Sequence, residues 1–258
     1  MSYIISSLSK LRWSILFGIC LTLVLNSCQT QTPSGPPTDE GVSTEDQLSE
    51  QTDTAELPHS LSIAQIQARE HISPYRNQSI SGIPGIVTLV KSDGFYMQSP
   101  SPDDDPGTSE GIFVYTDFVP SVKPGDEVRV DGMVEEMIPG GGYGNLSITQ
   151  IRNPEVETIS TGNVLPEPTV IGITGRIQPT EIIDDDTNGF VTENVVYDPE
   201  NDGLDFYESL ESMLVQVNDA VVVGPTNAYK EIVVLADGGE NAGIRSTRGG
   251  IVIRENDY

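Results

Sequence analysis

Residues 94–116 read GFYMQSPSPDDDPGTSEGIFVYT, and this stretch decides the fold class of the chain. Two aromatic and β-branched runs, 94–98 and 111–116, flank an acidic loop rich in Pro, Gly and Ser. Aromatic and β-branched residues favour strands, whereas Gly, Pro, Asp and Ser favour turns and loops. The stretch therefore predicts two short strands joined by an acidic loop.

Further strand patterns surround this stretch. Residues 126–137 alternate apolar and polar side chains, which is typical of a strand with one buried face. With 83–90 and 145–152 they bring the count to five strands in about 70 residues, a pattern that fits a small barrel such as the five-stranded OB-fold. Ser62 and Gln65 have the spacing of a capping box, which predicts one helical turn before the first strand. We expect an all-β fold with an OB-like barrel over residues 61–160.

Residues 161–258 predict a second small β domain, long enough for one small core. One helical turn is expected at 206–211. The expected strands are 170–177, 213–217, 220–223, 231–235 and 250–253.

The N-terminus has the pattern of a secretory signal. Lys10 and Arg12 precede an apolar run over 13–25, which is shorter than the roughly 20 residues of a membrane-spanning helix. A small residue then precedes Cys28, and the segment resembles a bacterial lipoprotein signal. Residues 1–27 are thus expected to be removed and Cys28 to be lipidated. An ordinary cleaved signal with a coincidental cysteine is the alternative.

Residues 28–60 are rich in Gln, Thr, Ser, Pro and acids, and such a segment cannot bury enough apolar surface to fold. We expect a disordered tether that holds the folded part away from the membrane. The predicted location is extracytoplasmic, with the lipid anchored in the outer membrane or at the cell surface.

The charge of the chain is strongly negative. It carries 39 acidic and 13 basic residues, a formal net charge of −26. Because phosphate contacts supply most non-specific affinity for nucleic acids, this charge opposes a simple DNA-binding role. A divalent cation would change the sign locally.

Three blocks of the chain resemble the N-terminal accessory region of extracellular bacterial nucleases with an endonuclease/exonuclease/phosphatase-type catalytic domain. The blocks are IAQIQ and HISP (63–67, 71–74); GFYMQ, TSEGIFVY and PGDEV (94–98, 108–115, 124–128); and DGLDFYESLESMLV with RGGI (202–215, 248–251). The resemblance implies an OB-fold-like module that precedes a nuclease domain and binds or positions DNA or RNA.

In that family the catalytic domain begins after the third block, whereas this sequence ends at Tyr258. We expect either a truncated reading frame or a stand-alone form of the accessory region, without catalysis of its own. His71 has no acidic partner that the sequence identifies, so a structural role is expected for it.

Two groups of acidic residues are candidate Ca²⁺ ligands, because Ca²⁺ prefers carboxylate and carbonyl oxygens. One lies in the loop between the aromatic runs and the other in a second acidic segment. They are Asp103, Asp104, Asp105 and Glu110, and Asp198, Asp202 and Asp205. The second group misses the EF-hand pattern, since Ser209 stands where that motif needs a glutamate. A solvated acidic loop remains the alternative for the first group.

Candidate nucleic-acid contacts are Tyr96, Tyr115, Lys91 and Arg129. Aromatic side chains on an OB surface stack on bases, and cations contact phosphates. Alternation places Phe95 and Tyr96 on opposite faces of their strand, so packing in the core is the competing expectation for these aromatics.

Three functions stay open at this point: a nucleic-acid-binding accessory module; an acidic, Ca²⁺-stabilised surface lipoprotein that binds protein or polysaccharide; and an active nuclease. The missing catalytic residues disfavour the third.

Overall fold

The computed structural model describes residues 61–141, 145–186, 196–228, 230–240 and 242–252. The predicted signal peptide, Cys28 and the tether lie outside the described residues. Pro58–Tyr258 form one compact unit. No helix within the described part of the chain is both long and apolar enough to cross a membrane.

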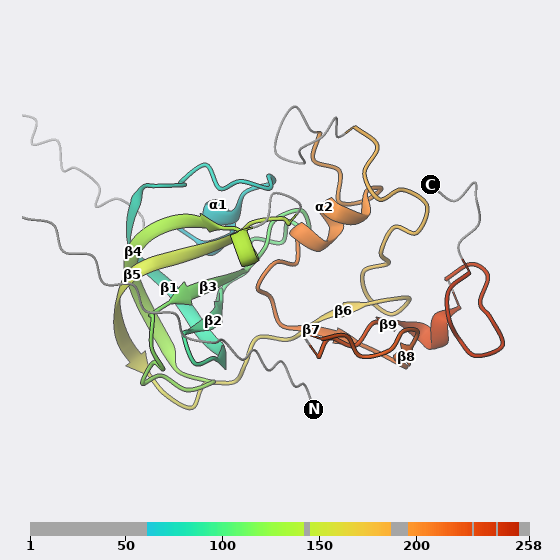
Figure 1. Ribbon diagram of the computed structural model, residues 1–258. Helices are drawn as coiled ribbons and strands as arrows, with labels where there is room; N and C mark the ends of the chain where they lie inside the picture. The colour runs from blue at the N-terminus through green and yellow to red at the C-terminus, as the bar shows by residue number, and fades with distance from the viewer. Residues whose placement is uncertain (1–60, 142–144, 187–195, 229, 241, 253–258) are drawn as a thin grey trace, which may run out of the picture. The chain divides into compact units, whose positions relative to one another are not determined.

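Five strands close into a barrel in the order β1-β2-β3-β5-β4 (Figure 1). Its strands are β1 (Ser79–Val90), β2 (Gly94–Gln98), β3 (Gly111–Tyr115), β4 (Glu127–Met137) and β5 (Ile148–Ser160). β3 and β5 run parallel, and the other neighbouring pairs are antiparallel. This order and mixed pairing are those of an OB-like barrel, so the predicted all-β fold class is confirmed.

The alternation of side chains explains the barrel core. Val128, Val130 and Val134 of β4 are fully buried, whereas Arg129, between the first two, and Asp131, after them, are exposed. Phe95 and Met97 of β2 also point inward. Each fully buried aliphatic or aromatic side chain contributes about 1.5–3 kcal/mol to folding.

The helical turn α1 (Ile63–Gln67) packs Ile63 and Ile66 into the same core. The predicted capping box is confirmed: Gln65 N donates to Ser62 Oγ at 3.1 Å, and Ser62 N donates to Gln65 Oε1 at 2.9 Å. A short 3₁₀ turn, η1 (Pro139–Gly141), lies between β4 and β5.

The later part of the unit has little regular structure. Its elements are β6 (Thr169–Ile171), α2 (Gly203–Glu208), β7 (Val215–Val217), β8 (Val221–Val222), β9 (Val234–Leu235) and η2 (Asp237–Gly239). β6 pairs with β7, and β8 with β9 (Figure 1). A small core of Ile171, Phe206 and Leu210 joins α2 to β6.

Several predicted bounds were wrong. β1 begins at Ser79 rather than 83, and β5 ends at Ser160 rather than 152. The predicted strand 170–177 stops at Ile171, because the chain turns at Gly172 with a φ of 123°. The helical turn expected at 206–211 begins earlier, at Gly203.

Candidate functional site

The outer side of β2 and β3 carries a pair of aromatic rings. Tyr96 and Phe113 are cross-strand partners, and their ring centroids lie 4.8 Å apart at 47°. Phe113 is only 4% exposed, yet it is not part of the barrel core cluster. Gly94 allows this packing, since a Cβ there would come within 2.6 Å of Phe113 Cζ.

Two cations join these rings on what we call the β2–β3 face, formed by Lys91, Tyr96, Phe113, Tyr115 and Arg152. Lys91 Nζ lies 5.0 Å from the centroid of Phe113 and 5.9 Å from that of Tyr96. Such cation–π contacts are worth about 0.5–1 kcal/mol at exposed sites. Arg152 of β5 pairs with Tyr115 in the strand register.

Acidic side chains border the same face. Tyr115 Oη donates to Asp117 Oδ1 at 2.7 Å, and Arg152 Nη1 lies 2.7 Å from Glu135 Oε1. Burial, and then the charges of Asp93 and Glu211, raise the pKa of the Tyr96 hydroxyl. The face therefore combines aromatic rings with both signs of charge.

The structure brings together part of the predicted nucleic-acid set. Lys91 contacts Tyr96 directly, and Tyr115 follows Phe113 by two residues on the same side of β3. Arg129 pairs instead with Pro84 of β1 and Glu157 of β5. Among the described residues, Arg129 makes no contact with the aromatic pair, so it is not part of the β2–β3 face.

The acidic loop between β2 and β3 is held by its own hydrogen bonds. Asp103 N donates to Glu110 Oε1 at 2.7 Å, and Asp105 N donates to Asp103 Oδ1 at 2.9 Å. Asp105 Oδ1 accepts from Gly107 N and from Arg69 Nη1, both at 2.8 Å. The Gly107 amide, followed by the Arg69 guanidinium, keeps the pKa of Asp105 low. Asp104 has a φ of 65° at the turn.

The second predicted group is divided among different tasks. Asp205 Oδ2 accepts from Asp198 N at 2.6 Å, and its Oδ1 contacts His71. Asp202 is the buried residue that precedes α2. Among the described residues, no group of three His, Cys, Asp or Glu side chains is arranged to hold a metal ion. The Ca²⁺ prediction thus rests on the sequence alone.

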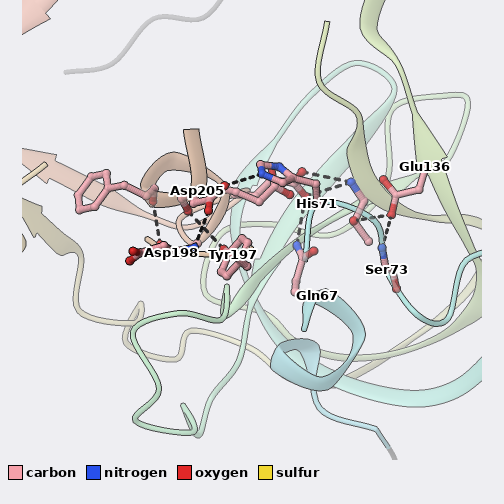
Figure 2. Close-up of polar contacts among 12 residues, drawn as sticks. Gln67, His71, Ser73, Glu136, Tyr197, Asp198 and Asp205 are labelled. Atoms are coloured by element: carbon pink, nitrogen blue, oxygen red, sulfur yellow. Dashed lines mark hydrogen bonds and ion pairs between the residues drawn. The ribbon is translucent and has the colours of Figure 1, made fainter. Parts of the chain in front are cut away.

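His71 lies between two carboxylates, as Figure 2 shows on the Asp205 side. Its Nε2 is 2.7 Å from Asp205 Oδ1, and its Nδ1 is 3.2 Å from Glu208 Oε2. The residue is 4% exposed, and Tyr197 contacts its ring edge-on at 5.8 Å. Burial lowers the pKa of His71, but the hydrogen bonds and charges of Glu208 and Asp205 outweigh it and raise the pKa above 6.5.

The expectation that His71 lacks an acidic partner was therefore wrong. The partners stand 134 and 137 residues further along the chain. A structural role still fits, because both ring nitrogens face carboxylates and neither is open to solvent.

Two more glutamates extend this contact toward the barrel strands. Thr149 N of β5 donates to both oxygens of Glu211, at 3.1 and 3.2 Å, and Gln67 Nε2 donates to Glu211 Oε1 at 3.1 Å. Glu136 Oε1 accepts from Ser73 N at 2.8 Å and from Thr149 Oγ1 at 2.9 Å (Figure 2).

We call His71, Glu136, Asp205, Glu208 and Glu211 the acidic cluster. Burial, and then the charge of Glu208, raise the pKa of Glu211 well above its ordinary value. Burial also raises the pKa of Glu208, against the lowering effect of His71. One histidine thus lies between two of these four acids, and the cluster joins α2 and the turn after it to α1, β4 and β5.

Sequence reasoning missed Glu136, Glu208 and Glu211. One signal was available, because Asp205, Glu208 and Glu211 follow one another at intervals of three, which places side chains on one side of a helical turn.

The fold defines the class of this protein as an all-β chain built on a closed five-stranded, OB-like barrel. Residues 170–258, less than half of the chain, match the model of a family described as a domain of unknown function, DUF8508. The matched segment contains α2 and with it the three carboxylates that reach toward the barrel. No curated protein and no solved structure matches this chain.

Proposed function

We propose that this protein is a non-catalytic, lipid-anchored extracytoplasmic module that binds single-stranded nucleic acid on its β2–β3 face, as an accessory part of an extracellular nuclease system. The observation that carries the proposal is the ring pair Tyr96–Phe113 with Lys91 above it. In OB-folds, the face of strands 2 and 3 and the loop between strands 1 and 2 bind oligonucleotides and oligosaccharides. Lys91 belongs to that loop, and the rings to those strands.

The charges suit weak binding rather than tight binding. Lys91 and Arg152 are the cations of this face, and each has an acidic neighbour. Lys91 Nζ lies 3.9 Å from Asp93 Oδ1, and Arg152 Nη1 lies 2.7 Å from Glu135 Oε1. Stacking on Tyr96 and Tyr115 would then supply most of the affinity, because every base offers an aromatic face. The resemblance to nuclease accessory regions supports this class of ligand.

Fluorescence anisotropy of a labelled oligothymidylate tests the proposal. Tyr96→Ala should weaken binding by about 1–3 kcal/mol, the value of one stacked base. Lys91→Gln should lower the salt dependence by about 0.7 in the slope of log K against log salt. Tyr207→Ala, which removes a 56% exposed tyrosine of α2, is the matched control.

The titrations should be run in Ca²⁺ and in EDTA, followed by a denaturing gel. Intact oligonucleotide with Tyr96-dependent binding supports the proposal. Equal affinity of the wild type and Tyr96→Ala contradicts it, and cleavage contradicts its non-catalytic part.

The acids at the edge of the face favour a second candidate, a neutral polysaccharide. Asp93, Asp117 and Glu135 repel a phosphate backbone but accept hydrogen bonds from sugar hydroxyls. Retention of the protein on an immobilised neutral glucan, lost in Tyr96→Ala, with no oligonucleotide binding, would select this ligand instead.

A further inference from the structure

Two arginines from distant parts of the sequence line one small cavity. Arg69 follows α1, and Arg176 follows β6; the cavity between them has a volume of about 240 Å³. Ile177 and Phe206 contribute apolar walls. Typical sites for drug-sized ligands measure about 300–1,000 Å³, so this cavity suits a smaller molecule.

Arg176 is held in place by a hydroxyl group and an aromatic ring. Its Nη2 donates to Ser209 Oγ at 2.9 Å, and its Cζ lies 4.8 Å from the ring centroid of Phe206. In the described part of the chain, no carboxylate lies within 4.0 Å of its guanidinium nitrogens. Burial lowers the pKa of Arg176, which reflects the cost of an uncompensated charge. Among the described residues only Ser209 accepts a hydrogen bond from this guanidinium, so most of its five N–H donors are available to a ligand.

Arg69 is fixed on the other side of the cavity. Its Nη1 donates to Asp105 Oδ1 at 2.8 Å, and its Cζ lies 5.9 Å from the ring centroid of Tyr197. Gly107 lines the cavity too, and a Cβ at that position would clash with the Arg69 guanidinium. Glycine at 107 therefore permits this orientation of Arg69.

The charge of the cavity differs from that of the chain. Its lining has two guanidinium groups and one acid, the exposed Glu200, in a protein with a net charge of −26; Asp105, outside the lining, pairs with Arg69. Neither arginine forms an ion pair with Glu200 among the described residues. Guanidinium forks match the oxygens of phosphate and carboxylate, and a phosphate offers enough oxygens to meet two forks at once.

We propose that the cavity between Arg69 and Arg176 is a binding site for a phosphate monoester group. The group is either that of a small free molecule or the terminal phosphate of an oligonucleotide. This site is separate from the β2–β3 face, and it does not rest on the function proposed above.

Isothermal titration calorimetry of the full chain in non-ionic detergent tests the site, with inorganic phosphate as the probe. Arg69→Gln and Arg176→Gln should each weaken binding about tenfold, the loss expected for one charge-assisted hydrogen bond. Arg76→Gln is the matched control, because Arg76 is exposed and does not line the cavity. It should bind phosphate as the wild type does.

Glu200→Gln keeps the test decisive if Arg176→Gln fails to fold. It removes the one acid of the cavity, so phosphate should bind about two- to fivefold more tightly. Absence of saturable binding by the wild type at about 10 mM phosphate would overturn the proposal. Unchanged affinity in Arg69→Gln and Glu200→Gln together would overturn it as well.

A trithymidylate with a 5′-phosphate, compared with its 5′-hydroxyl form and with glucose 6-phosphate, distinguishes the two sources. Arg69-dependent preference for the 5′-phosphorylated form supports the site and assigns it to oligonucleotide ends. Binding of glucose 6-phosphate without that preference supports it for small phosphomonoesters. If neither the 5′-phosphorylated trithymidylate nor glucose 6-phosphate binds in the cavity, the proposal fails, even if the β2–β3 face binds oligothymidylate.

Discussion

His71 is the residue on which the acidic cluster depends. Its ring contacts Asp205 and Glu208, and its substitution would leave two buried carboxyl groups without this partner. Breaking a buried pair by removing one partner costs about 3–5 kcal/mol. We expect His71→Ala to lower the free energy of unfolding by that amount, measured by urea denaturation.

An exposed ion pair supplies the control for this substitution. Arg152 pairs with Glu135 on the surface, where such pairs contribute about 0–1 kcal/mol. Arg152→Gln should therefore change the stability by less than about 1 kcal/mol. Equal effects of the two substitutions would show that the His71 contacts add no more than a surface pair.

At the residue scale, the partners of His71 could not be predicted from this sequence. Alternation along β2 separates Phe95 from Tyr96, and the structure confirms that Phe95 belongs to the core. No local pattern links residue 71 to residue 205, because their contact depends on how α2 packs in the folded chain. The same holds for Arg69 and Arg176.

At the scale of elements, α2 and the turn after it contact the barrel side through side chains whose protonation depends on pH. The pKa values of His71, Glu208 and Glu211 are all raised, so the folded state binds their protons more tightly than the unfolded chain does. The contribution of His71 is complete below pH 6.5 and is lost as the pH rises through its folded pKa. The two carboxyl groups lose their contribution as the pH rises above 4.5.

All three groups act in the same direction, so we expect the free energy of unfolding to be larger at about pH 5.5 than at about pH 8. Asp105, whose pKa is lowered, loses its contribution only as the pH falls below 3.8. Urea denaturation across this range measures the slope, which Glu211→Gln should reduce. Stability that increases from pH 5.5 to 8 would contradict the assignment.

The loop between β2 and β3 leads to a prediction about metal removal. Glu110, Asp103 and Asp105 accept hydrogen bonds from backbone amides of this loop. We expect EDTA to leave the Tm unchanged, because these bonds do not require a cation. Asp103→Asn should lower the Tm in both buffers. A higher Tm in Ca²⁺, lost in Asp103→Asn, would favour the calcium hypothesis instead.

Segments with a clear strand composition or alternation were predicted, and irregular ones were not. β4 was recognised because apolar side chains recur at every second position, and β1, β2 and β3 because their segments are rich in β-branched or aromatic residues. The second half of β5 was missed, since residues 153–160 include Pro154 and three charged or amide side chains that face outward. The prediction for β6 was too long because the apolar sequence continues past the turn at Gly172. The residues beyond that turn, Ile173 and Ile177, are exposed.

At the scale of the whole molecule, the barrel and the segment matched to DUF8508 share buried groups. Ser109 Oγ donates to Glu211 O, and Leu214 N donates to Gln98 Oε1 at 2.9 Å. Gly111 lies so close to the backbone of Ser212 that a Cβ would clash with it. The segment therefore covers one end of β2 and β3.

A truncation tests whether this contact stabilises the barrel. Residues 58–169 retain every barrel strand but lose Asp205, Glu208 and Glu211, so His71 loses both carboxyl groups and Gln67 loses its contact with Glu211. We expect this fragment to be less stable than residues 58–258 by about 3–5 kcal/mol, as for the loss of one partner of a buried pair. Urea denaturation followed by far-UV circular dichroism measures the difference.

The matched control is a fragment of residues 58–217, which keeps α2 and β7 and lacks only β8, β9 and η2. Its barrel should be nearly as stable as that of residues 58–258, because the acidic cluster remains complete. Hydrogen exchange adds a second measure: the amides of β3 and α2 should exchange with the same free energy of opening in residues 58–258. If residues 58–169 were as stable as 58–217, the barrel would be independent of α2, and the acidic cluster would serve only to position the matched segment.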